Sequence, residues 1–234
     1  MVKEKENAVE SVVSRFSSTI LRSHFGKGPK SVYVNIVHPF ICIQIRDFLS
    51  PMEKILLSKN EKIKVLELRD LLMDEIQEEF KRSFWKEANF DVKELYADWN
   101  LERKSGMILA VLKEGDINKE PWPEEVDEKA LLDEIIKVSE IGQKVPGSTE
   151  VFWLSDRTLL IRRIEIFTLL EKELIKQGFA ETLKLAKRPL EYKLFKQSEL
   201  EEILKRSINE VFFDWNFNED KGYAVIALQK NDNS

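Results

Sequence analysis

Cysteine is almost absent from this chain, and so are apolar runs long enough to cross a membrane. Cys42 is the only cysteine among 234 residues, which excludes an intrachain disulfide and favours a cytosolic setting. No stretch of about 20 apolar residues occurs, so we expect no transmembrane segment. The N-terminal stretch MVKEKENAVE mixes charges of both signs and lacks the apolar core of a secretory signal. We therefore expect a cytoplasmic protein.

Residues suited to catalysis or metal binding are scarce as well. His24 and His38 are the only histidines, and neither has a second histidine or a cysteine at the spacing of a zinc site. No stretch has the sequence context of a nucleophile elbow. We expect a protein that is not an enzyme and that carries no metal or cofactor.

An excess of positive charge is also missing. Residues 1–117 contain 19 Lys and Arg against 19 Asp and Glu, and residues 118–234 contain 18 against 23. The second half therefore carries the whole net charge of -5. Binding to the phosphate backbone of nucleic acids requires a basic excess. Nucleic acid is accordingly not an expected partner.

One pattern is present, and it occurs twice at an offset of 116 residues. An Asp-Trp-Asn tripeptide, a glycine and an apolar run follow one another in each copy: Asp98, Trp99, Asn100, Gly106 and 107–112, then Asp214, Trp215, Asn216, Gly222 and 223–228. Each copy predicts two strands joined by a polar turn, whose glycine would supply the positive φ of a chain reversal. So long a period indicates a duplicated domain, because solenoid repeats are much shorter.

The elements before each hairpin recur in the same order. The first half predicts a helix over 6–25, a hairpin over 32–45 and a helical region over 51–88, in which Leu66, Leu68, Leu71, Leu72, Ile76 and Phe80 would form the buried stripe. Ser50 and Glu53 have the spacing of a capping box at its start. Thr168 and Glu171 repeat that box, before a helical stretch that we expect Pro189 to interrupt.

These elements predict an α+β protein of two tandem α-β-β-α-β-β domains. Each domain would be an antiparallel four-stranded sheet with helices on one face. The boundaries predicted are 1–115 for the first domain and 127–234 for the second, with an acidic, proline-containing linker at 116–126 in which Trp122 would be pinned to a surface. We expect the two domains to pair as a pseudo-dimer within a monomer, or the chain to form a homodimer.

The loop Gly26-Lys27-Gly28-Pro29 allows two interpretations. Its backbone N–H groups and Lys27 could cradle an anion, which makes Lys27 and Gly28 candidate binding residues. Alternatively, the glycines and the proline only end a helix before a strand. A phosphate loop follows a strand and precedes a helix, whereas this loop follows a helix, so we favour the second interpretation.

The duplicated polar residues also allow two interpretations. Asp98, Asn100, Asp214 and Asn216 could line a ligand or partner site on a pseudo-twofold axis. Near a strand end, Asp and Asn commonly hydrogen-bond the turn backbone instead, while tryptophans such as Trp99 fill the core. We favour this structural role. We also expect the pair Arg162-Arg163 to lie on a solvated edge rather than in an anion site.

Several stretches of the first half together resemble the MpsC-like family: GKGPKSVYV, the strand that ends in LSPMEK, the long charged helix, and the Asp-x-Asn strand with its Lys-x-Gly turn. The resemblance covers residues 8–113, which is the whole family domain. The second half is a divergent copy that lacks the Gly-Lys-Gly-Pro loop and the Pro-Met pair. The function of those positions would therefore be confined to residues 26–29 and 51–52.

What the resemblance implies is a role beside a membrane complex. Members of that family are small bacterial cytosolic proteins assigned to a sodium-translocating, membrane-potential-generating system connected with inorganic-carbon uptake. The resemblance implies a noncatalytic accessory or regulatory protein without a cofactor, whose partner is a membrane transport complex and which can lie at the membrane periphery. The alternative is a small-molecule sensor that binds a ligand between the two repeats.

Overall fold

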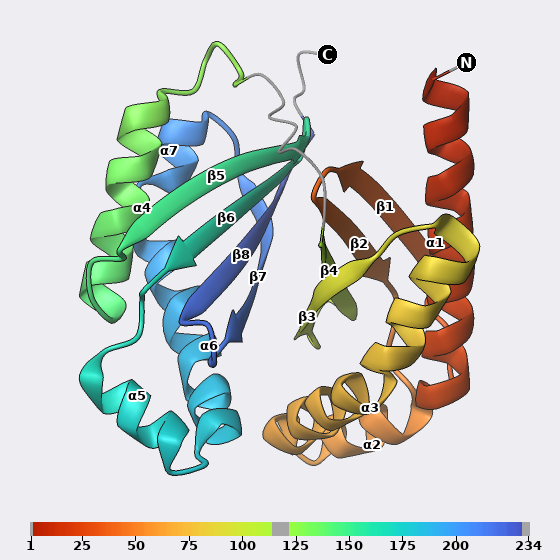
Figure 1. The fold of residues 1–234 in the computed structure, drawn as a ribbon. Coiled ribbons are helices and arrows are strands. Elements are labelled where there is room, and N and C mark those ends of the chain that lie inside the picture. The colour runs from red at the N-terminus through yellow and green to blue at the C-terminus, as the bar shows by residue number, and fades with distance from the viewer. Residues whose placement is uncertain (1, 114–121, 231–234) are drawn as a thin grey trace. The chain divides into compact units, whose positions relative to one another are not determined.

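The same order of elements occurs twice along the chain (Figure 1). The computed structural model describes residues 2–113 and 122–230. The chain divides into two units, Met1–Asn118 and Lys119–Ser234. Residues 116–121 of the predicted linker at 116–126 lie outside the described residues, so its bounds stay a prediction. The pairing of the units as a pseudo-dimer also stays a prediction.

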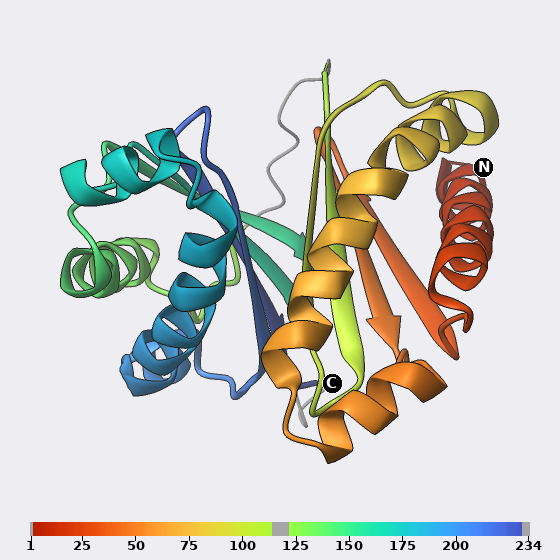
Figure 2. The ribbon, with the colours of Figure 1, turned by 90° about the horizontal axis from the view of Figure 1, so that it is seen from below.

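The first unit is one antiparallel sheet with helices on one face (Figure 2). Its elements are α1 (Val2–Phe25), β1 (Ser31–Val37), β2 (Phe40–Arg46), α2 (Pro51–Ser58), α3 (Lys62–Ala88), β3 (Val92–Asn100) and β4 (Ser105–Leu112). The strand order is β1-β2-β4-β3. Apolar side chains from α1 and α3 pack against alternate residues of β2 and β4, such as Ile43 and Ile108, and form the core.

The second unit has the same strand order and an additional short helix. Its elements are α4 (Glu128–Gly142), β5 (Ser148–Ser155), β6 (Thr158–Ile164), α5 (Leu169–Lys176), α6 (Ala180–Gln197), α7 (Leu200–Leu204), β7 (Ile208–Asn216) and β8 (Lys221–Leu228). All pairings in its sheet, β5-β6-β8-β7, are antiparallel. The predicted α+β class, with a four-stranded antiparallel sheet in each half, is therefore confirmed.

Both predicted capping boxes are present. The Ser50 hydroxyl accepts a hydrogen bond from the Glu53 amide, and the Glu53 carboxylate accepts one from the Ser50 amide at 2.7 Å. Thr168 and Glu171 make the same reciprocal pair at the start of α5, with the corresponding carboxylate distance at 2.8 Å. Each box satisfies backbone donors that a helix start would otherwise leave unpaired. Trp122 also packs as predicted, edge-on against Trp153.

The turn glycines have a different role from the predicted one. The left-handed residues of the two turns are Lys104, with φ 54°, and Asp220, with φ 50°, so the glycines do not supply the positive φ. Gly106 instead pairs with Trp99 across the strands, and a Cβ built on Gly106 would lie 2.3 Å from the indole ring. Glycine is needed there because the tryptophan ring lies directly over the neighbouring backbone.

Two helix predictions were wrong. Leu68 and Leu71 are 41% and 69% exposed, and the inward position between them belongs to Arg69, which is fully buried. Pro189 lies inside α6, which continues through it, and the breaks fall instead at Gly178 and Ser198. Proline inside a helix removes the hydrogen bond that its own N–H would donate and crowds the carbonyl four residues earlier. The helix is continuous despite this cost, and α6 packs against α4, α5 and β7.

We expect Gly106→Ala to destabilise the first unit by about 1–3 kcal/mol, because the added methyl group overlaps the Trp99 ring. Gly28→Ala is the matched control, since its added methyl group meets the flexible, exposed Arg22 side chain and should change stability by less than about 0.5 kcal/mol. Urea unfolding followed by tryptophan fluorescence measures both. Equal effects of the two substitutions would contradict this role of Gly106.

Candidate functional site

The loop that follows α1 holds two of the predicted binding residues. Lys27 donates from Nζ to the Asp47 carbonyl at 3.4 Å. A Cβ on Gly28 would lie 2.8 Å from Nε of Arg22, so this glycine is closely covered by a side chain. Gly26 has φ 69° and ends α1 in the left-handed conformation that favours glycine. The loop thus has the geometry of a helix stop.

The duplicated Asp and Asn residues bind backbone at the ends of their strands. Asp98 and Asp214 each accept a hydrogen bond from the next residue's amide at 2.8 Å. Asn100 accepts one from the Arg103 amide at 3.1 Å, and Asn216 accepts two from its own turn. Asp214 also pairs with Lys184 at 2.9 Å. These contacts agree with the structural interpretation of the repeat.

A buried ion pair lies directly under the first capping box. Arg69 of α3 donates from Nε to Glu53 Oε1 at 2.6 Å and from Nη2 to Glu53 Oε2 at 3.0 Å. A third hydrogen bond from Nη2 reaches the Phe48 carbonyl at 2.9 Å. The exposed fraction is 0% for the Arg69 side chain and 3% for that of Glu53. The same carboxylate therefore caps α2 and fixes α2 to α3.

Aromatic rings enclose the Arg69 guanidinium. Its carbon lies 4.6 Å from the centre of the Trp99 ring, 4.9 Å from that of Phe48 and 5.7 Å from that of Phe25. A planar cation is attracted by the faces of aromatic rings, and the attraction strengthens where water is excluded. The predicted core residue Trp99 thus covers a buried charge as well as filling space.

The second unit has the corresponding pair at positions 118 residues later, Glu171 and Lys187. Lys187 Nζ donates to Glu171 Oε1 at 2.7 Å, and it lies 5.2 Å from the ring centres of both Phe167 and Trp215. The Lys187 side chain is only 4% exposed. The two units therefore share a capping glutamate, a buried cation and a tryptophan over that cation.

A second buried ion pair occurs in the second unit. Arg163 of β6 binds Glu191 of α6 through two hydrogen bonds of 3.1 and 3.0 Å, and it donates to the Ser139 hydroxyl at 3.2 Å. Its side chain is fully buried. The prediction that Arg162-Arg163 lies on a solvated edge was wrong for Arg163, because β6 is an inner strand and α6 supplies a carboxylate above it.

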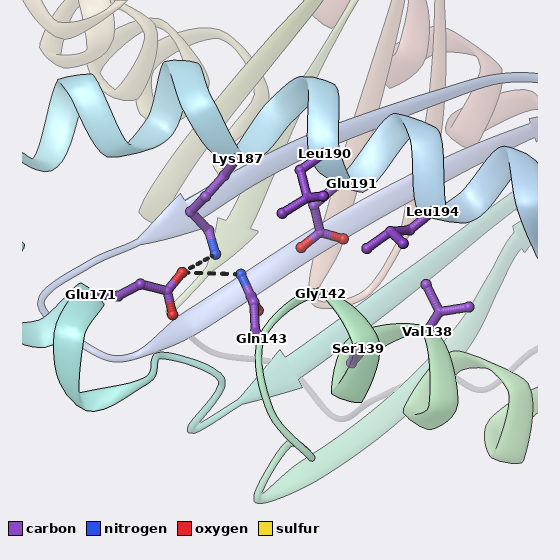
Figure 3. A pocket seen from close by; sticks show the side chains of 9 residues that line it. All are labelled: Val138, Ser139, Gly142, Gln143, Glu171, Lys187, Leu190, Glu191 and Leu194. Carbon is purple, nitrogen blue, oxygen red and sulfur yellow. Dashed lines mark hydrogen bonds and ion pairs between the residues drawn. The ribbon is translucent and has the colours of Figure 1, made fainter.

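A pocket opens beside these two ion pairs (Figure 3). It lies between α4 and α6, close to the start of α5, and is partly open to solvent. Its polar lining includes Glu171, Lys187, Glu191 and Gln143. Gln143 donates to Glu171 at 3.4 Å, whereas its buried carbonyl oxygen has no hydrogen-bond partner. The pocket thus offers an unsatisfied acceptor next to carboxylates and a lysine.

The first unit has apolar residues where the second has this polar group. Positions separated by 118 residues pair Leu21 with Ser139, Phe25 with Gln143, Ile45 with Arg163, and Met73 with Glu191. All four residues of the first unit belong to its core. Arg163 and Glu191 hydrogen-bond each other, so the replacements at these two positions are coupled. The polar pocket is therefore a property of the second unit.

Burial and pairing act in opposite directions on the charges of these sites. Burial alone would raise the pKa of Glu53, but the hydrogen bonds and charge of Arg69, together with Ser50, hold that pKa below its usual value. Burial lowers the pKa of Lys187, and the adjacent Glu171 carboxylate only partly offsets this effect.

Two other kinds of site are absent from the described parts of the chain. Over residues 2–113 and 122–230, no group of three or more His, Cys, Asp or Glu side chains is placed to hold a metal ion. None of the helices in these ranges is long and apolar enough to span a membrane.

The buried ion pairs of the structure were not predicted from the sequence patterns. Arg69, Arg163 and Glu191 were not predicted as site residues. Their partners lie 16 and 28 positions away along the chain, beyond the reach of helix or strand periodicity. One signal was available: Arg69 and Lys187 occupy matching positions behind matching capping boxes.

Comparison with known protein families matches residues 5–114 to the family described as the Na+-translocating membrane potential-generating system (MpsC). The first unit belongs to the MpsC family. The predicted resemblance is thereby confirmed, and the MpsC range includes the Glu53–Arg69 pair and Trp99. No curated protein and no solved structure matches the chain.

The two buried residues Arg163 and Glu191 should be replaceable as a pair. We expect Arg163→Ile alone to cost about 3–5 kcal/mol, because it leaves the Glu191 carboxylate buried and unpaired. Glu191→Met alone should cost a similar amount. The double variant installs the residues found at the matching positions of the MpsC unit, and we expect it to lie within about 1 kcal/mol of the wild type.

Urea unfolding of the four chains measures this cycle. Ser139 needs no further change, because its hydroxyl also donates to the Ile135 carbonyl at 2.8 Å. A double variant as unstable as the sum of the single variants would show that the two units do not use these positions in the same way.

Proposed function

We propose that this protein is a noncatalytic accessory component of a sodium-translocating system that generates membrane potential. The observation that carries this proposal is the match of residues 5–114 to the MpsC family. The protein would act from the cytoplasm on a membrane complex, and the link to inorganic-carbon uptake belongs to the same proposal. The polar side chains described above support a noncatalytic role, since they serve in caps, turns and buried ion pairs.

Membrane potential in the source cell tests this function. We expect deletion of the gene to remove the sodium-dependent part of the potential, and expression of the full chain to restore it. A voltage-sensitive dye measures the potential in sodium medium, and choline medium is the control. An unchanged response to sodium in the deletion strain would contradict the proposal.

A second candidate function is that of a small-molecule sensor, and the pocket of the second unit favours it. The Gln143 carbonyl and the carboxylates of Glu171 and Glu191 are hydrogen-bond acceptors. Val138, Leu190 and Leu194 supply an apolar wall. A compact ligand with a hydrogen-bond donor at one end and a short hydrocarbon part would complement this lining. We place the ligand of the proposed sensor here.

Short primary amines and primary amides are suitable probes. A ligand that binds only the folded state raises the melting temperature by mass action, so a probe that enters the pocket should raise it in a concentration-dependent way. Gln143→Leu removes the unsatisfied carbonyl and should abolish the shift. A shift that is identical in wild type and Gln143→Leu would exclude this pocket as its origin.

A further inference from the structure

Large apolar side chains are exposed on two consecutive helices of the first unit. We define the α2–α3 surface by the residues Met52, Ile55, Ile63, Leu68 and Leu71, whose exposed fractions range from 41% to 69%. Single exposed apolar residues are ordinary, but here five occur on two consecutive helices within residues 52–71. Groups of this kind mark sites of interaction with another molecule or with a membrane.

This surface contributes little to the core. In α3 the inward positions belong to Val65, Arg69 and Met73, so Leu68 and Leu71 lie on another side of the helix. Helix periodicity alone predicts that both leucines are buried. Their apolar character is therefore not explained by the folding of the unit.

Positively charged side chains are frequent near Met52, Ile55 and Ile63, whereas Glu67, Asp74 and Glu75 are exposed near Leu68 and Leu71. Lys54, Lys59, Lys62 and Lys64 are all exposed. Lys62 also pairs with Glu102 at 2.9 Å, which brings the turn between β3 and β4 to the same region. That turn adds the exposed residues Arg103 and Lys104. Six cationic side chains thus lie in a region with the exposed carboxylates of Glu67, Asp74, Glu75 and Glu102 and the partly exposed one of Glu61, which pairs with Lys64.

The matching positions of the second unit have a different charge. Ile55 and Ile63 correspond to Glu173 and Glu181, 118 residues later. At the same offset the four lysines correspond to Lys172, Gln177, Ala180 and Thr182. At the offset of 116 that relates the Asp-Trp-Asn hairpins, Arg103 and Lys104 correspond to the acidic residues Glu219 and Asp220. The second unit also exposes apolar side chains, Leu169 and Leu170 at the start of α5 and Phe179 just before α6. Around Ile55 and Ile63, however, the first unit has more cationic residues than the second unit has at the matching positions.

We propose that the α2–α3 surface docks onto an anionic lipid bilayer. The apolar side chains would enter the boundary between headgroups and acyl chains, while the lysines around them face lipid phosphates. Long lysine side chains suit this border, because their hydrocarbon stems reach over apolar surface and keep the ammonium in water. Charge complementarity selects anionic lipid as the occupant. The proposal extends the proposed function, and protein-free vesicles test it separately from the sodium response.

Vesicle flotation with the full chain is the experiment. We expect the wild type to float with vesicles of phosphatidylglycerol and phosphatidylethanolamine and not with vesicles of phosphatidylcholine. Binding should weaken as salt is added, since ionic screening reduces attraction at an exposed surface. The double variant Ile55→Glu, Ile63→Glu carries the second unit's residues and should lower the partition coefficient by about tenfold or more.

The second unit provides the matched control. Leu169→Ser with Leu170→Ser removes two exposed apolar residues outside the α2–α3 surface and should leave flotation unchanged. All variants change exposed positions, so each should keep the wild-type urea midpoint and thereby exclude unfolding as a cause. Absence of wild-type flotation, equal loss in both double variants, or binding only to vesicles that contain membrane proteins would overturn the lipid assignment. The last result would assign the surface to a protein partner.

Discussion

Each unit depends on a carboxylate that performs two structural tasks at one point. Glu53 accepts the amide of Ser50 and so begins α2, and its other interactions hold Arg69 of the neighbouring helix. Arg69 in turn binds the Phe48 carbonyl just after β2 and lies against Trp99 at the end of β3. Removing either charged partner would leave a buried, unpaired charge, which is among the most destabilising changes a fold can suffer. One ion pair thus joins two helices to both hairpins.

The position of Trp99 over the Arg69 cation requires a glycine at the residue paired with Trp99. Trp99 can cover Arg69 only if its ring lies flat against β4, and the residue paired with it there is Gly106. A side chain at that position would displace the ring, as the 2.3 Å approach of a built Cβ indicates. In the second unit Trp215 covers Lys187 and pairs with Gly222. The repeated Trp and Gly are therefore parts of one arrangement around a buried charge.

Local features could be predicted from the sequence, and features that depend on distant partners could not. The capping box at Ser50 follows from a spacing of three residues, and the strands follow from apolar runs beside turn residues. The burial of Arg69 depends on a glutamate 16 residues away, and that of Arg163 on one 28 residues away. A charged residue is predicted to be exposed unless the residue that pairs with it is known. For the same reason, Leu68 was predicted to be buried and Arg69 was not, whereas Arg69 is the buried residue.

The two units have residues of different polarity at matching positions, both in the core and on the surface. The first has an apolar core at the positions where the second has Arg163, Glu191 and a pocket. Its surface is cationic near Ile55 and Ile63, where the second unit has glutamates. Buried polar groups contribute less to stability than well-packed apolar ones, and exposed apolar groups reduce solubility. Neither departure is required by the fold, because in each case the other unit forms the same sheet without it. Features that a fold does not need, and that reduce stability or solubility, are where function is to be sought. By that reasoning we assign the proposed docking surface to the first unit and the proposed ligand pocket to the second.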